Sequence, residues 1–275
     1  MRGDFHTHTL ASDGVMTPDE LLSEARKHGL THLAITDHDT FDSSFYAKDL
    51  NLKDIEIIIG LELSTANSGE SVHILGYFKN KEDARKIFPA LEKTRNDRRV
   101  RSEKMLDLLE KEGIKLDRSF LRKGNVVTRG EISREIMRQG YPYDNKTIFE
   151  KFLGNGCPCY IEAAKVKTAD GIKLILEAGG FPVLAHPALL TKNDPEAIVK
   201  MGVKGIEASY GSRLSEEPRF RALAKKYNLV VTGGTDFHKF DDGHHVNIGT
   251  HYIQDEDIIK FKEALYGSAK EASSR

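Results

Sequence analysis

Short apolar segments alternate with amphipathic segments over the first third of the chain. Four apolar runs have the length of β-strands, and they cover Phe5–Leu10, His32–Thr36, Ile55–Leu61 and Val72–Tyr77. Between the first two runs, Thr17-Pro18-Asp19-Glu20 has the pattern of a helix start, with Thr17 as N-cap and Glu20 completing a capping box. A succession of strand, helix and strand favours a parallel α/β architecture.

From Lys79 to about Gly156 the pattern changes to charged, helix-like segments without a clear strand. The alternation then resumes. Further helices are expected at Ala169–Ala178, Glu196–Met201, Glu217–Tyr227 and Asp257–Tyr266, and further strands at Pro182–Ala185, Gly205–Ser209 and Leu229–Thr232. We therefore predict two domains, an α/β domain formed by residues 1–79 and 157–275 and a helical insertion, or cap, formed by residues 80–156.

The predicted strands of both segments total about seven, which is in the range of a closed or nearly closed β/α barrel. A flat, doubly wound sheet is the alternative fold. Such a sheet would carry a glycine-rich phosphate loop after its first strand, and the sequence has none there.

Composition narrows the class of protein. The 275 residues are 39% hydrophobic and 30% charged with a formal net charge of −1, so no global basic field predicts a nucleic-acid coat protein. The two cysteines, Cys157 and Cys159, fit a reducing compartment. The longest apolar run, Ile55–Leu61, is too short to span a bilayer. We expect a cytoplasmic protein with no membrane association and no obligate protein partner.

The chain has 11 histidines, and several follow apolar strand-like runs. His6 and His8 are two residues apart, so on a strand both would project from one face and could bind one metal ion. Seven more polar residues are candidate ligands, and most of them follow an apolar run at its C-terminal end, as Glu62 follows Ile55–Leu61. They are Asp13, His38, Glu62, His73, His186, Asp236 and His238. If these side chains were only structural, each would need its own hydrogen-bond partner, whereas a shared cluster of divalent cations satisfies all of them.

Several motifs of this sequence resemble the PHP family, named for polymerase and histidinol phosphatase domains. They are D-F-H-T-H at Asp4–His8, S-D-G at Ser12–Gly14, T-P-D-E-L at Thr17–Leu21, T-D-H at Thr36–His38, G-L-E at Gly60–Glu62, V-H-I-L-G-Y at Val72–Tyr77, A-H-P at Ala185–Pro187 and T-D-F-H at Thr235–His238. The resemblance covers essentially the whole chain. Within the family, the sequence resembles the predicted phosphoesterase branch. This branch is related to a 3′,5′-nucleoside bisphosphate phosphatase and an RNA 5′-end exonuclease.

The resemblance implies a distorted (β/α)7 TIM-like barrel with an inserted helical subdomain and a trinuclear metal centre. Carried over by position, the first metal would be held by His6, His8, Glu62 and Asp236, the second by Glu62 as a bridge with His73 and His186, and the third by Asp13, His38 and His238. Some relatives have a histidine in place of Asp13, and the aspartate favours the phosphoesterase branch. Mixed nitrogen and oxygen ligands suit Mn²⁺, Zn²⁺ or Fe²⁺.

The expected reaction is hydrolysis of a phosphate ester, in which a hydroxide bridging two metal ions attacks phosphorus. The segment containing Arg129 resembles the family segment whose arginine contacts a substrate phosphate, although Gly130-Glu131 replaces the usual Pro-His. Arg98 and Arg213 are further candidate phosphate-binding residues. Asp4 and Asp37 are expected to orient ligand imidazoles or to act as local caps. His244, His245 and His251 are predicted to be surface or cleft-rim groups.

We expect a small phosphorylated substrate, such as a 3′,5′-bisphosphonucleotide or the 5′ end of a short RNA. One alternative is a histidinol-phosphate phosphatase, which Asp13 and the position of the insertion disfavour. The other is a non-catalytic metal-binding module, which would be expected to have degenerate ligand positions, and none of the nine positions is degenerate.

Overall fold

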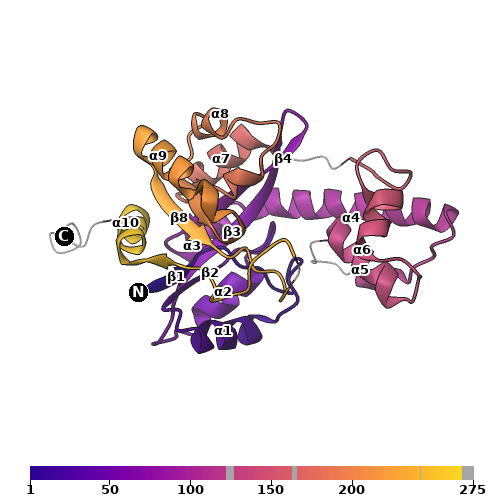
Figure 1. Cartoon of the computed structure of the whole chain (residues 1–275), viewed down its shortest axis with the longest axis horizontal. Helices are drawn as coiled ribbons and strands as arrows, with labels where there is room; N and C mark the ends of the chain where they lie inside the picture. Colours follow the sequence, from indigo (N-terminus) through magenta and orange to yellow (C-terminus); the bar gives the residue numbers. More distant parts are fainter. Residues whose placement is uncertain (122–126, 163–165, 242, 268–275) are drawn as a thin grey trace. The chain divides into compact units, whose positions relative to one another are not determined.

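The computed structural model describes residues 1–121, 127–162, 166–241 and 243–267 (Figure 1). The chain forms two compact units. One comprises Met1–Pro89 and Val166–Arg275, which we call the barrel unit, and the other comprises Ala90–Lys165, which we call the helical unit. Within the described residues, no helix combines the length and apolar character that crossing a membrane requires.

The barrel unit is built on one sheet with the strand order β8-β7-β6-β4-β3-β2-β1-β9. Its strands are β1 (Arg2–Asp4), β2 (His32–Ile35), β3 (Glu56–Asn67), β4 (Glu70–Phe78), β6 (Phe181–Leu184), β7 (Gly205–Tyr210), β8 (Val230–Gly234) and β9 (Ile253–Gln254), while the short β5 (Val166–Lys167) pairs with β3. The sheet closes between its two sides, because Phe5 N donates to Gly233 O at 3.1 Å and Thr7 pairs with Phe237. The predicted α/β barrel is confirmed.

Helices connect most of these strands. In the barrel unit they are α1 (Pro18–Lys27), α2 (Asp42–Asp49), α3 (Lys81–Arg85), α7 (Thr168–Glu177), α8 (Pro195–Val199), α9 (Glu217–Tyr227) and α10 (Asp255–Tyr266), with 3₁₀ turns η3 (Pro187–Leu189) and η4 (Gly211–Glu216). The capping box predicted for α1 is present, since Glu20 N donates to Thr17 Oγ1 and Thr17 N donates to Glu20 Oε2. The N-terminal amine pairs with Asp255 at the start of α10, and Figure 1 shows the N-terminus beside this helix.

Two apolar clusters hold the barrel unit together. The first contains Phe5, Tyr77 and Phe261, whose rings are in mutual contact, with centroids 4.9 Å apart for Phe5–Phe261 and Tyr77–Phe261. The Tyr77 hydroxyl donates to Phe5 O at 2.7 Å, so this buried ring also fixes the backbone just before His6. The second cluster buries the apolar face of α1, including Leu21, against neighbouring strands. Burial of such large side chains stabilises the fold by roughly 1.5–3 kcal/mol each.

The structure corrects three expectations about strands. The predicted strand Phe5–Leu10 is wrong: the strand is β1 (Arg2–Asp4), and the segment after it is held by the backbone following β8. Glu62 does not end its strand but lies in the middle of β3, which continues to Asn67. It continues because β4 runs antiparallel to it as a long hairpin, so the sheet is mixed and not wholly parallel.

The helical unit has its own core. The long helix α4 (Phe88–Lys111) starts in the barrel unit and supplies most of its length to the helical unit, which also contains η1 (Arg118–Phe120), α5 (Arg129–Arg138), α6 (Asn145–Ile148) and a π-helical turn η2 (Phe149–Leu153). Met105, Leu109, Ile132, Ile136 and Leu153 are fully buried in this core. No strand occurs within residues 90–121 and 127–162. The predicted role of residues 80–156 as a cap stays a prediction.

Glu70, at the start of β4, links the β3–β4 hairpin to the loop that follows η3. Its carboxylate accepts hydrogen bonds from the backbone amides of Thr191, Lys192 and Asn193 at 2.6 to 3.1 Å. Partial burial would raise the pKa of Glu70, but hydrogen bonds from Thr191 and Asn193 outweigh this effect and lower it to about 2.

The hydrogen bonds accepted by Glu70 predict that the stability of the folded protein depends on pH. Because the folded-state pKa of Glu70 lies below its ordinary value of 4.5, its contribution is complete above pH 4.5 and is lost as the pH falls toward 2. We expect Glu70→Gln to lower the free energy of unfolding by about 1–2 kcal/mol at pH 7, measured by urea denaturation, with a smaller difference at pH 3. An equal difference at both pH values would contradict this account.

Candidate metal centre

Glu62 of β3 lies at the centre of a cluster of polar side chains and is only 1% exposed. Its Oε1 is 2.8 Å from His73 Nδ1 and 3.0 Å from His186 Nε2. Its Oε2 is 3.0 Å from His38 Nδ1. Since its two oxygens face different histidines, Glu62 has the arrangement of a carboxylate that can bridge two cations.

Asp236, which follows β8, meets both histidines of the N-terminal segment. Its Oδ1 is 3.2 Å from His6 Nε2 and 3.2 Å from His8 Nε2. The same two nitrogens are 3.5 and 3.3 Å from Glu62 Oε2. Ligand atoms that each bind one ion at about 2.1 Å lie roughly 3 to 3.5 Å from one another, so His6, His8, Glu62 and Asp236 have the spacing of a shared cation site.

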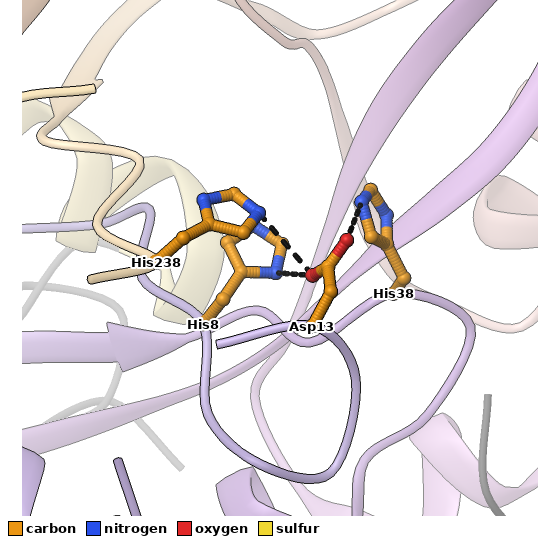
Figure 2. Close-up of side chains that lie close together, drawn as sticks. All are labelled: His8, Asp13, His38 and His238. Atoms are coloured by element: carbon orange, nitrogen blue, oxygen red, sulfur yellow. Dashed lines mark ion pairs between the residues drawn. The ribbon is translucent and has the colours of Figure 1, made fainter. Parts of the chain in front are cut away.

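Asp13 gathers a second group, shown in Figure 2. Its Oδ1 is 3.2 Å from His238 Nε2 and 3.6 Å from His8 Nδ1, and its Oδ2 is 3.6 Å from His38 Nε2. The loop carrying Asp13 turns back tightly at Gly14, where a Cβ atom would lie 2.5 Å from His8 O. Glycine is therefore required for the close approach that puts the carboxylate among three imidazoles.

Two of these residues have a strained backbone. His186 and Asp236 have positive φ angles of 27° and 52°, which non-glycine residues rarely adopt. Hydrogen bonds maintain both conformations: His186 N donates to Glu207 Oε2 at 2.7 Å, and Asp236 N donates to His6 O at 2.8 Å. Strain of this kind concentrates where a side chain must be aimed at a functional centre.

The electrostatics of the cluster depend on mutual attraction between imidazoles and carboxylates. Burial would raise the pKa of Glu62, but the nearby His38, His73 and His6 lower it well below its usual range. Burial would lower the pKa of His8, but its interactions with the Asp236 and Glu62 carboxylates, 3.2 and 3.3 Å from Nε2, raise it to about 10. Without a metal ion, protons on the histidines therefore supply the positive charge that the carboxylates need.

The donor set fits a bound cation. His6 Nε2, His8 Nε2, His38 Nδ1 and Asp236 Oδ1 are buried and have no hydrogen-bond partner. An unsatisfied buried polar atom costs about 1–3 kcal/mol, and these four residues belong to groups whose ligand atoms lie within 4.8 Å of one another. Divalent cations satisfy such atoms together, because neutral imidazole and carboxylate are both ligands for them.

Glu207 of β7 is a site residue that the sequence analysis missed. Its two carboxylate oxygens are 3.1 and 3.2 Å from His6 Nδ1, and the side chain is fully buried. Because the Glu207 carboxylate accepts a hydrogen bond from His6 Nδ1, the other ring nitrogen of His6 is turned toward Asp236 and Glu62. Glu207 also accepts from the backbone of His186 and so positions two members of the cluster. The only sequence signal was a glutamate inside the apolar strand Gly205–Tyr210.

Tyr210 was missed for a similar reason, since a tyrosine that ends an apolar strand suits a core. Its hydroxyl donates to Asp236 Oδ2 at 2.9 Å. Asp4 and Asp37 lie close to the cluster, and backbone amides donate to both carboxylates, which fits the expected alternative of local caps. Asp4 accepts from Thr235 N and Oγ1, and Asp37 accepts from Thr9 and Ser12. Both carboxylates thus fix the backbone that carries the histidines.

The candidate phosphate-binding arginines lie in different units. Arg129 is the first residue of α5, and its Nη1 donates to Leu153 O and Asn155 Oδ1, both at 3.1 Å. Burial, with the nearby Arg129 and Arg98, lowers the pKa of Arg101 to about 10, so three guanidinium groups lie near one another in the helical unit. Arg213 belongs to the barrel unit and is exposed in η4.

The Glu207 contact generates a prediction for metal binding. We expect Glu207→Gln, which keeps the shape but removes the charge that faces His6, to weaken divalent metal binding about 10- to 100-fold. Competition with a chromophoric chelator measures this affinity. The matched control is Glu177→Gln, which neutralises an exposed carboxylate at the end of α7 and should bind like the unaltered protein. A folded Glu207→Gln variant with unchanged affinity would refute the positioning role.

Comparison with curated proteins gives relatives over most of the chain. A 5′-3′ exoribonuclease of Haemophilus influenzae is 31% identical over 86% of this chain and 89% of its own. A phosphoribosyl 1,2-cyclic phosphate 1,2-diphosphodiesterase of Eggerthella lenta is 31% identical over 88% of this chain and 97% of its own. A 3′,5′-nucleoside bisphosphate phosphatase of Chromobacterium violaceum is 29% identical over 87% and 88%. All three names denote enzymes that hydrolyse phosphate esters.

The fold is also that of a solved structure. A Bifidobacterium adolescentis protein assigned as a metal-dependent phosphoesterase superposes with a TM-score of 0.83 at 24% identity, over 98% of each chain. The family model for the PHP domain matches residues 4–152, which include six of the nine candidate ligands: His6, His8, Asp13, His38, Glu62 and His73. With these matches and relatives that share its length, the chain belongs to the PHP domain family.

Proposed function

We propose that this phosphoesterase acts on nucleotide-type substrates, either 3′,5′-bisphosphonucleotides or the 5′ ends of short RNA. The hydrolysis of phosphate esters is the activity shared by the names of its relatives. The observation that carries the proposal is Glu62, a buried carboxylate whose two oxygens contact three histidines within 3.0 Å. A carboxylate in this position could be shared by two divalent cations, which would supply positive charge for a phosphoryl group.

We propose nine metal ligands in three sets. The first ion is held by His6, His8, Glu62 and Asp236, the second by Glu62, His73 and His186, and the third by Asp13, His38 and His238. Distances within the sets support this assignment: 3.2 to 3.5 Å between the histidines and the carboxylates of the first set, 2.8 and 3.0 Å from Glu62 to His73 and His186, and 3.2 and 3.6 Å from Asp13 to His238 and His38. Mn²⁺, Zn²⁺ and Fe²⁺ all suit this mixture of nitrogen and oxygen donors.

The chemistry follows from the residues of the cluster. Divalent ions, when bound, supply positive charge for the phosphoryl oxygens and lower the pKa of water. The nine proposed ligands include no serine or cysteine, and the nucleophile we propose is a water molecule that bound metal ions would activate. Glu207 and Tyr210 keep His6 and Asp236 in fixed orientations, which limits the reorganisation needed when substrate binds.

All nine proposed metal ligands belong to the barrel unit. Arg129 and Arg98 of the helical unit are proposed as binding groups for a phosphate. The proximity of arginines in the helical unit supports this role, since several guanidinium groups near one another favour an anion. Arg213 is a weaker candidate from the barrel unit. The two free cysteines support a cytoplasmic location.

Two other functions are distinguishable by substrate. Histidinol-phosphate phosphatase is disfavoured by Asp13, and faster hydrolysis of histidinol phosphate than of nucleotides would favour it. The relative from Eggerthella lenta acts, by its name, on a cyclic phosphate, so a cyclic phosphodiester belongs among the substrates to be compared. A non-catalytic metal-binding module would bind ions and release no phosphate.

The proposal predicts metal-dependent phosphate release. Protein loaded with Mn²⁺ should release phosphate from 3′,5′-bisphosphonucleotides or mononucleotides from short 5′-phosphorylated RNA, and removal of metal with a chelator should abolish the activity. Glu62→Gln should lower kcat on the order of 100-fold or more, because it removes charge from the bridging position. Glu177→Gln is again the matched control. Absence of hydrolysis of every nucleotide substrate by metal-loaded protein would overturn the proposal.

Arg129 provides a test of the substrate side. We expect Arg129→Ala to raise KM for a bisphosphonucleotide about tenfold or more, with a smaller change in kcat, because a charge-assisted hydrogen bond contributes about 1.5–3 kcal/mol. Since Arg129 also bonds to Asn155, Asn155→Ala is the control for a purely local effect on the helical unit. The same increase in KM in both variants would indicate that Arg129 has only a structural role.

A further inference from the structure

His245 lies beside the metal centre although it comes from the loop after β8. Its Nε2 is 3.5 Å from Asp236 Oδ2, and its ring stacks on His238 with centroids 4.3 Å apart and planes 23° apart. Asp236, His238 and His245 each offer one ligand atom, and these atoms all lie within 4.8 Å of one another. From sequence, His245 and its exposed neighbour His244 are both predicted to be surface or cleft-rim groups.

The loop fixes the position of His245 from both sides. Before it, Asp241 N donates to Asn247 Oδ1, and Asn247 Nδ2 donates back to Asp241 Oδ1, both at 3.0 Å. After it, Val246 packs so closely on Gly211 that a Cβ at Gly211 would lie 2.3 Å from a Val246 methyl group. Ile248 is fully buried in the cluster around Phe237. These contacts fix the loop on either side of His245, and the stacking on His238 orients its ring.

We propose that His245, together with Asp236 and His238, forms a further site for a divalent cation, beyond the three ions assigned above. This inference rests on the proposed metal centre and extends it beyond the nine ligands. The site would take a hard or borderline cation such as Mn²⁺ or Zn²⁺, because its donors are two imidazole nitrogens and one carboxylate oxygen. The side chain of His245 is 23% exposed, so an ion can reach this edge from solvent.

A phosphate contact is the other role open to a histidine at this place, and the charges argue against it. The carboxylate of Asp236 is 3.5 Å from the imidazole and would repel a phosphate oxygen at the same nitrogen. A cation between Asp236 and His245 is attracted by the same carboxylate. Tyr210 donates to Asp236 Oδ2, which keeps this oxygen directed to its position near His245.

The test is calorimetric titration of the metal-free full chain with Mn²⁺, comparing the unaltered protein with His245→Ala, His245→Gln and the control His244→Ala. We expect both His245 variants to bind one fewer ion, or to bind the weakest ion at least about tenfold more weakly. His244→Ala should match the unaltered protein. Because glutamine keeps the size of the side chain, loss in both variants is not explained by a collapsed loop, and thermal unfolding of the metal-free variants checks their folding.

Unchanged stoichiometry and affinity in the His245 variants would overturn the proposal. Unchanged Mn²⁺ binding with weaker inhibition by inorganic phosphate would also overturn it, and would assign His245 to anion binding. Failure of the proposed function has a different signature: the unaltered protein would bind Mn²⁺ but hydrolyse no phosphate ester, and His245 would still be tested by the titration. An unaltered protein that binds no Mn²⁺ would contradict both.

Discussion

Two carboxylates, Glu62 and Asp236, are almost completely buried and face the same imidazoles of His6 and His8 at 3.2 to 3.5 Å. Neither carboxylate could stay ionised there without positive charge close by, because removal of a charge from water costs several kcal/mol unless it is paired. Bound cations or protonated histidines must supply that charge. This requirement explains the arrangement of the site, because segments far apart in the chain place their histidines around the two carboxylates.

The barrel fold brings these segments together. The segments after β1, β6 and β8 all lie at strand ends, where β/α barrels commonly build their sites. The β3–β4 hairpin adds Glu62 and His73 from the interior of long antiparallel strands. A layer of orienting groups then supports the cluster: Glu207 holds His6, and Asp4 and Asp37 hold the backbone of the segments that carry the histidines. The chain therefore uses buried acids for two separate purposes.

Most of the fold and the cluster could be predicted from sequence, because both follow local rules. Apolar runs predicted the central strands, and the capping box predicted the start of α1. The H-x-H pair and the polar residues after strands predicted the cluster that the structure brings together. The prediction was wrong where hydrogen bonds between distant segments determine the structure. Residues 5–8 are held by the backbone after β8 and do not extend β1. Glu62 lies inside an antiparallel hairpin, and no local pattern indicates the direction of its second strand. The sequence does not predict Glu207 and Tyr210 as site residues, and it predicts His245 only as a surface or cleft-rim group, because their roles depend on contacts between distant segments.

The central claim is that Glu62 lies between two bound cations. The most direct measurement is anomalous X-ray diffraction from crystals of the protein loaded with Mn²⁺, with data collected on either side of the manganese absorption edge. The account predicts anomalous peaks on both sides of the Glu62 carboxylate, one bounded by His6, His8 and Asp236 and the other by His73 and His186. Well-ordered crystals that show these side chains but no peak within ligand distance of Glu62 would contradict it.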